Sequence, residues 1–330
     1  MKEDKNDLQQ KNFLYLVPSG SDSESAKVDF VKLFKQIWAG KWIILTVSFV
    51  FTLLSGYYAF SQPNYYKSVA FLSPAGVASG ADSSLAGGLG GLASLAGIRL
   101  GGGGKNKAEL ALAILKSKRF IVSFAKKEAI VVPLIAGERW DPLSETLILN
   151  EKVYDASSNH WLPAAMQPGR DAPSDNLIYQ KLFSRLTVAE DKRSGYVTIS
   201  LQYYSPVLAK EWLEKLVSAL NAEMKNKDID DAQKNIEFLE AQAQRTDVIE
   251  VKRVIFDLIE SEIRTAMLAN AREDYIYEYI DPPTVPEMKS GPDRKLMVIL
   301  GFMAGIIFGT IIVLISGLFK RKAVNLQSNS

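Results

Sequence analysis

LMVILGFMAGIIFGTIIVLISGLF, residues Leu296–Phe319, is an uninterrupted run of 24 uncharged and mostly apolar residues. As an α-helix this run would be about 36 Å long, enough to cross a hydrocarbon core of about 30 Å with some tilt. Three basic residues follow it directly, at Lys320, Arg321 and Lys322. The stretch therefore predicts a transmembrane helix near the C-terminus.

Three glycines recur every four residues within this run, at Gly301, Gly305 and Gly309. Residues four apart share one face of a helix, and small residues on one face let helix backbones approach closely in a membrane. Glycine is also common in transmembrane helices generally, so the argument depends on the spacing and not on the composition. We expect these glycines to form a helix-packing surface.

A second uncharged run, Trp42–Phe60, is 19 residues long and lies near the other end of the chain. About 40 residues precede it, and no small-x-small cleavage site follows it, so it is predicted to be an uncleaved anchor. Lys67 alone follows it closely, whereas four lysines precede it, at Lys27, Lys32, Lys35 and Lys41. The positive-inside rule then places the N-terminal tail, residues 1–41, in the cytoplasm. Two crossings of the membrane return the C-terminal tail, residues 320–330, to the same side. Within the N-terminal tail, Val28–Trp38 is expected to form an amphipathic helix at the membrane surface or, alternatively, a docking helix for a cytoplasmic partner.

The residues between the two spans, 61–295, form one domain of about 235 residues, which is large enough to bury a core of its own. The chain has no cysteine, so this domain does not depend on disulfides. The formal charge is +2, and we expect no nucleic-acid partner. The predicted fold class is α+β and membrane-anchored, with two terminal transmembrane helices at 42–60 and 296–319 flanking an α/β base that lies outside the cytoplasm.

Local patterns predict the elements of this base. Strands are expected at Tyr65–Leu72 and Tyr275–Ile280, and alternating apolar residues between 186 and 203 predict a β-hairpin. One helix is expected at Lys107–Glu128, with Asn106 as its N-cap, and a short one at Asp175–Phe183. The segment 130–173 shows few periodic signals.

Residues 206–274 contain helix-forming residues with no glycine or proline after Pro206, which predicts long helical arms that project beyond the base. We divide them at residues 245–247, because Asp247 followed by Glu250 has the form of a capping box. Each arm has a narrow apolar seam, expected to be buried against the partner arm or the next subunit. The seam residues are Ile229, Ile236, Leu239 and Ala243 in the first arm, and Val248, Val251, Ile255, Leu258 and Ile263 in the second.

The segment 76–104 is rich in glycine interleaved with alanine, leucine and serine. It is expected to be a mobile loop, or a flap that orders only against a neighbouring subunit. The residues predicted to make that contact are Leu89, Leu92, Leu95 and Ile98. The segment is not a phosphate-binding P-loop, because Arg99 and Asn106 stand where that motif needs glycine and serine or threonine.

No catalytic, cofactor or metal site is predicted. The single histidine, His160, lies beside Trp161 and cannot form a histidine-rich metal site alone. Carboxylates such as Asp281 or Glu287 do not by themselves indicate a glycosidase. The alternative is an unrecognised glycan-modifying enzyme, and cleavage or joining of glycan units by the purified domain would favour it.

Prolines punctuate the segment before the C-terminal span, at Pro282, Pro283, Pro286 and Pro292, and the Gly305-xxx-Gly309 motif follows them. Two further stretches are ALAILKSKRF (Ala111–Phe120) and SGYVTISLQYYSPVLAKEW (Ser194–Trp212). In these features, and in their order over nearly the whole chain, the sequence resembles the Wzz-type chain-length determinants, the polysaccharide co-polymerases of Gram-negative bacteria. It departs from the family pattern at Gly291 and Asp293, where serine and lysine are usual around the last proline. Its glycine-rich segment also looks like that of related tyrosine autokinases, whose kinase domain follows the second span. This chain stops about ten residues beyond that span, so kinase activity is not expected.

The resemblance implies an inner-membrane, non-enzymatic regulator of the length of a surface polysaccharide, most simply lipopolysaccharide O-antigen. It implies a closed homo-oligomeric ring in the lipid bilayer that acts with a membrane polysaccharide polymerase. The polysaccharide chain itself is a further candidate partner, and direct binding of it is left open. The alternative hypothesis is a structural subunit or adaptor of a polysaccharide export complex, since such adaptors also project helical hairpins.

Overall fold

The computed structural model describes residues 35, 37–75, 103–163 and 171–327. The chain divides into two compact units, formed by residues 1–57 with 296–330 and by residues 58–295, and each is described by itself. The segment predicted to be a flap lies outside the described residues, apart from its last two positions, and so does most of the predicted amphipathic helix before residue 41.

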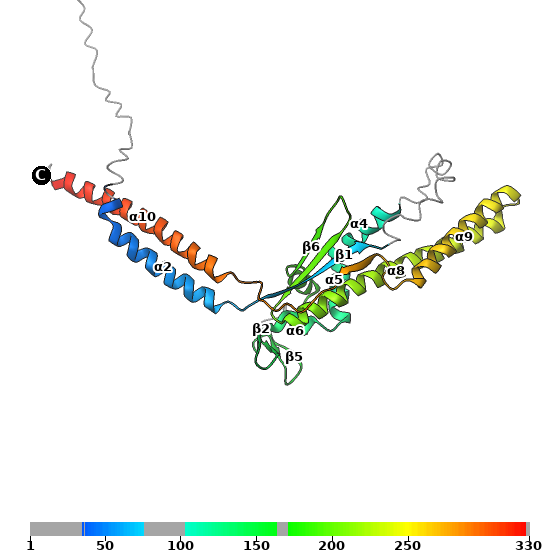
Figure 1. The fold of residues 1–330 in the computed structure, drawn as a ribbon, viewed down its shortest axis with the longest axis horizontal. Coiled ribbons are helices and arrows are strands. Elements are labelled where there is room, and N and C mark those ends of the chain that lie inside the picture. Colours follow the sequence, from blue (N-terminus) through cyan, green and yellow to red (C-terminus); the bar gives the residue numbers. More distant parts are fainter. Residues whose placement is uncertain (1–34, 36, 76–102, 164–170, 328–330) are drawn as a thin grey trace, which may run out of the picture. The chain divides into compact units, whose positions relative to one another are not determined.

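Two long apolar helices form the first unit, α2 (Lys41–Ser61) and α10 (Arg294–Gln327) (Figure 1). Both are long and apolar enough to cross a membrane, and most of their apolar side chains are exposed. A core helix of a soluble protein would bury such side chains. The two helices therefore fit a two-pass membrane protein.

The second unit is built on a four-stranded antiparallel sheet in the order β6–β7–β1–β8 (Figure 1). Its outer pair, β6 (Leu186–Glu190) and β7 (Val197–Tyr203), is the predicted hairpin and is confirmed. The first strand, β1 (Tyr66–Pro74), lies between β7 and the last strand, β8 (Tyr277–Asp281). The sheet thus joins the two ends of the unit, which lie far apart in the sequence.

One face of this sheet is buried. Ala70 of β1 lies opposite Ile199 of β7, and Leu72 lies opposite Val197, and all four side chains are fully buried. Helix α8 (Pro206–Arg245) lies against β1 and β7 and buries Trp212 and the apolar residues that follow it at helical spacing. The buried residues alternate along the strands and recur about every 3.6 residues along the helix, and both sets pack into one core.

Short helices complete the core. They are α4 (Gly103–Lys116), α5 (Lys118–Lys127), α6 (Val131–Ala136) and α7 (Asp175–Phe183). The predicted single helix at 107–128 is wrong, because Ser117 is extended and its side chain caps the new helix by accepting a hydrogen bond from Phe120 N at 3.3 Å. The predicted N-cap at Asn106 is also wrong, because α4 begins at Gly103.

The segment with few periodic signals contains α6 and two small hairpins. These are β2 (Gly137–Asp141) with β3 (Thr146–Leu149), and β4 (Tyr154–Asp155) with β5 (His160–Trp161). Residues of intermediate exposure follow one another along these strands. A strand with one buried and one exposed face would instead show strict alternation of apolar and polar residues. Sequence reasoning missed them for this reason.

The predicted arms are α8 and α9 (Ile249–Ala271), which run side by side away from the sheet (Figure 1). Their 40 and 23 residues correspond to about 60 Å and 35 Å of helix. The break near residue 246 is confirmed, but the capping box is wrong, because α9 begins after Val248 with no side-chain cap.

Asn221 fixes α8 to the chain that enters β8. Its side-chain oxygen accepts hydrogen bonds from the backbone N–H groups of Ile276 and Tyr277, at 3.1 and 3.0 Å, and its amide donates to Tyr277 O at 2.8 Å. The side chain is 3% exposed. Burying an amide is favourable only when its polar atoms are satisfied, as they are here.

Candidate functional site

Gly301, Gly305 and Gly309 lie on the face of α10 that meets α2 of the same chain. A Cβ atom built on Gly305 would lie 2.5 Å from Ser48 Cα, and one on Gly309 would lie 2.9 Å from Ile44 Cα. A Cβ on Gly301 would collide with the side chain of Ser55. The three positions therefore have no room for a side chain, and the two backbones approach there as small-residue faces allow.

Other contacts along this helix pair agree with the close approach. Ser55 donates a hydrogen bond across the pair to Met297 O, with an oxygen–oxygen distance of 2.7 Å. The rings of Phe51 and Phe308 stack with centroids 5.3 Å apart. Near the other end, a Cβ on Gly40 would collide with Val313. The contact thus extends over most of α2.

The four prolines lie in a segment that runs back along the start of β1. Tyr65 and Gly291 form an isolated antiparallel bridge, in which Tyr65 N donates to Gly291 O at 2.8 Å. Ser68 donates to Thr284 O at 2.9 Å. Pro283 is buried, Pro286 and Pro292 are half-buried and Pro282 is exposed. These contacts join the chain leaving α2 to the chain entering α10.

Arg294, the first residue of α10, strengthens this junction. Its guanidinium donates to the carbonyl oxygens of Ala59 and Gln62, at 3.1 and 3.3 Å, and to Asn64 Oδ1 at 3.0 Å, and it lies over the Phe60 ring. Ala59 belongs to the last turn of α2, where carbonyls lack helical partners and a cation is favourable. Arg294 is therefore a positioning residue that sequence reasoning missed.

A group of three tyrosines and one arginine lies beside this junction, and we call it the Arg185 cluster. The Arg185 guanidinium lies over the rings of Tyr204 and Tyr203, with its carbon 4.6 and 5.0 Å from their centroids. Tyr65 stacks on Tyr204 at 5.1 Å, and Tyr203 packs against Trp212 at 4.3 Å. No local sequence pattern predicts this cluster, because Tyr65 and Arg185 are distant in the chain.

Burial changes the titration of two hydroxyls in the cluster. It raises the pKa of Tyr203, whose hydroxyl donates a hydrogen bond to Pro133 O. Burial, followed by the neighbouring Tyr204, also raises the pKa of Tyr65, although Arg185 opposes this. Burial disfavours the phenolate, so both groups stay protonated donors at neutral pH.

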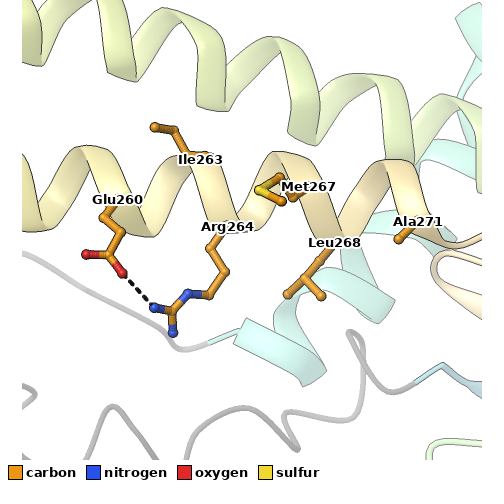
Figure 2. Close-up of a pocket in the computed structure, with 6 residues that line it drawn as sticks. All are labelled: Glu260, Ile263, Arg264, Met267, Leu268 and Ala271. Atoms are coloured by element: carbon orange, nitrogen blue, oxygen red, sulfur yellow. Dashed lines mark hydrogen bonds and ion pairs between the residues drawn. The ribbon is translucent and has the colours of Figure 1, made fainter.

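The helical arms carry several of the exposed large apolar side chains of the second unit. A groove on α9 is lined by Ile263, Met267, Leu268 and Ala271, with the Glu260–Arg264 ion pair at its edge at 2.9 Å (Figure 2). Val248 and Val251, two predicted seam residues, are also exposed. Of the predicted seam, Ile236, Leu239, Ala243 and Ile255 do pack together between α8 and α9, with Ile259 added.

The described residues contain no group of three or more His, Cys, Asp or Glu side chains that could hold a metal ion. His160 lies exposed in the short strand β5. Leu89, Leu92, Leu95 and Ile98 lie outside the described residues, so their predicted contact with a neighbouring subunit stays a prediction.

The comparisons with known proteins concern both sequence and fold. Residues 26–128 match the family model described as Wzz, chain length determinant protein. A search of curated protein sequences returned no match. This match covers less than a third of the chain, and over those residues it agrees with the resemblance to Wzz-type chain-length determinants found in the sequence.

Solved structures give low similarity scores. A full-length bacterial polysaccharide co-polymerase is 14% identical, covers 89% of this chain and 99% of its own, and has a TM-score of 0.37. A fragment of WzzB, the polysaccharide co-polymerase from Salmonella Typhimurium, is 14% identical over 69% of this chain and 100% of its own, with a TM-score of 0.27. Scores below 0.5 do not establish a shared overall arrangement, so no further conclusion is drawn from them.

Proposed function

Because residues 26–128 are of the Wzz chain-length-determinant type, we propose that this chain is a non-enzymatic regulator of surface polysaccharide length. Lipopolysaccharide O-antigen is the polysaccharide we propose. The family match is the observation that carries the proposal, and the two apolar helices at either end of the central unit support it.

The proposed placement is the bacterial inner membrane, with α2 and α10 as its two spans. Both termini lie in the cytoplasm and residues 61–295 lie in the periplasm, in keeping with the lysines before α2 and the basic residues 320–322. The contacts of Tyr65, Ser68 and Arg294 support this placement. They join the segment that follows α2 to the segment that precedes α10, as expected if the chain leaves and re-enters the membrane on the same side.

The proposed working form is a closed homo-oligomeric ring that acts with a membrane polysaccharide polymerase and contacts the polysaccharide chain. The exposed apolar residues of α9 would supply a surface for a neighbouring subunit. The sequence of residues 76–104 is the basis for proposing a second such surface. The proline segment would stiffen the link between the domain and the second membrane span, because proline limits backbone rotation. In this proposal the chain supplies geometry and no chemical step.

The first test is the surface-polysaccharide ladder on a gel. A strain lacking the gene is compared with the same strain complemented by the wild-type chain. We expect a cluster of long polysaccharide chains in the complemented strain, and a smooth ladder biased toward short polysaccharide chains in the strain that lacks the gene. Loss of all surface polysaccharide would instead indicate the export-adaptor alternative.

A second test uses the helix pair. Gly305→Leu places a side chain where even a Cβ meets Ser48 Cα at 2.5 Å and Phe51 Cβ at 3.0 Å, so α2 and α10 must separate. We expect a smaller oligomer in detergent, measured by light scattering, and a ladder shifted to short chains.

Gly56→Leu is the matched control, because a Cβ at Gly56 in α2 has no atom within 4 Å. It adds the same side chain to the same helix pair and should leave oligomer and ladder unchanged. If Gly305→Leu also leaves both unchanged, the proposed role of the glycine surface in assembly is wrong.

A further inference from the structure

Arg185 has a positive charge that no acidic side chain balances among the described residues. Its guanidinium contacts the rings of Tyr203 and Tyr204, and no ion pair or side-chain hydrogen bond of this group occurs in the described parts of the chain. Two other arginines show the contrast, since Arg264 is paired with Glu260 and Arg294 donates to three oxygens. Cation–π contacts hold Arg185 in place without using its N–H donors.

The rings around Arg185 fix its position. Tyr203 is fully buried against Trp212, and Tyr204 is held between Tyr65 and Arg185. Arg185 is itself half-buried, and its backbone oxygen accepts a hydrogen bond from Gln202 N at 2.9 Å. A guanidinium that is held in one place, and whose N–H groups have no partner among the described residues, is suited to bidentate hydrogen bonding with an oxyanion. The half-exposed Tyr65 and Tyr204 hydroxyls are hydrogen-bonded to each other, which leaves one hydroxyl hydrogen of the pair to donate to a ligand beside the guanidinium.

The covalent chain keeps this cluster near the membrane surface. Tyr65 follows Ser61, the last residue of α2, by four positions, and four extended residues span at most about 14 Å. The last turns of α2, before Ser61, contain Tyr57, Tyr58 and Phe60, all exposed, as is typical of the membrane–water interface. The oxyanions most abundant at that level are the phosphates of lipid head groups.

We propose that the Arg185 cluster binds a phosphate group at the membrane surface, with the Arg185 guanidinium as the principal ligand and the hydrogen-bonded Tyr65–Tyr204 pair supplying one hydroxyl donor. A phospholipid head group or a phosphate free in solution could supply this group, and the test separates them. The inference depends on the membrane placement in the proposed function and not on chain-length regulation.

The experiment uses the purified full-length chain in a neutral detergent. Native mass spectrometry would measure the retention of phosphatidylglycerol and of diacylglycerol with the same acyl chains, and calorimetry would measure binding of inorganic pyrophosphate. Arg185→Gln removes the charge at the cluster. Arg193→Gln is the matched control, because it makes the same charge change in the exposed turn between β6 and β7.

We expect phosphatidylglycerol to bind more tightly than diacylglycerol, and Arg185→Gln to weaken its binding about tenfold, as loss of a charge-assisted hydrogen bond does. Arg193→Gln should change the binding of phosphatidylglycerol by less than about twofold, because an exposed surface charge contributes little. Should pyrophosphate binding show the same dependence on Arg185, the site takes free phosphate as well. Equal binding of both lipids, or equal binding by wild type and Arg185→Gln with no pyrophosphate effect, would overturn the proposal.

Tyr65→Phe gives a second variant in case Arg185→Gln does not fold. It keeps the ring that stacks on Tyr204 and removes one hydroxyl, so it should weaken lipid binding by about threefold with Arg185 intact. Lysine at position 185 keeps the charge without the planar fork and should restore part of the binding. No readout uses polysaccharide length, so failure of this inference and failure of the proposed function are distinguishable.

Discussion

The two halves of helix α8 lie in different surroundings. The first half, Pro206–Met224, buries Trp212 and six further apolar side chains in the core beneath the sheet, and Asn221 fixes it to β8. In the second half, Lys225–Arg245, the buried residues are Ala232 and Ala243. One continuous helix is thus held by a deep core at one end and by a thin seam with α9 at the other.

This difference predicts a gradient of local stability along the arm. Burying one large apolar side chain contributes about 1.5–3 kcal/mol, and the first half has many more of them than the second. Elements with few buried apolar contacts open first in native-state exchange. The outer arm is therefore expected to adapt to a partner while the base stays rigid.

The largest expected effect comes from alkaline pH. Burial raises the pKa of Tyr203, Tyr275 and Tyr277 in the base, and raises that of Tyr279 to about 12 with help from Glu214 and Asp274. Tyrosines in the unfolded chain ionise near pH 10. The contribution of these four tyrosines to the free energy of unfolding is therefore complete below pH 10, and it is lost as the pH rises toward their pKa values in the folded chain.

Residues 225–271 of the arms contain no tyrosine, so this effect should be confined to the base. Near-ultraviolet circular dichroism between pH 9 and 12, compared with far-ultraviolet helicity, would measure it. Loss of the helical signal before the tyrosine environment changes would contradict the prediction.

The next effect is expected for Trp212→Ala in the first half of α8. The side chain is 2% exposed and packs on Tyr203, so its removal leaves a cavity and should cost about 3–5 kcal/mol in the free energy of unfolding. Hydrogen exchange measured by mass spectrometry on the full chain should show faster exchange throughout β1, β7 and α8. Exchange that increased in α8 alone would mean that sheet and helix are not one cooperative unit.

The smallest effect is expected for Ile259→Ala in the seam between the arms. Ile259 is 8% exposed but belongs to a small cluster that can relax, so the expected cost is about 1–2 kcal/mol, confined to the outer arm. Met267→Ala is the control on the same helix, since Met267 is 66% exposed and should change stability by less than about 0.5 kcal/mol. Faster exchange in the base of α8 after Ile259→Ala would remove the distinction between the two halves.

Strong local periodicity made several elements predictable from the sequence. Alternation between 186 and 203 gave the β6–β7 hairpin, and the uncharged runs gave two apolar helices, at Lys41–Ser61 and Arg294–Gln327. The spacing of Gly301, Gly305 and Gly309 placed them on one face. The capping patterns were less reliable, because Asn106 and Asp247 have the right side chains for an N-cap while the helices start elsewhere.

The sequence by itself determined which segments are apolar, which are helical and where the long arms divide, because those properties depend on residues three or four positions apart. Only the tertiary structure decided which surfaces meet. It placed the glycines of α10 against Ser48 and Ser55 of the same chain, and it brought Arg185 onto Tyr203 and Tyr204 beside Tyr65. Such contacts join residues from distant elements, and they depend on how the sheet pairs its strands, which no local pattern encodes.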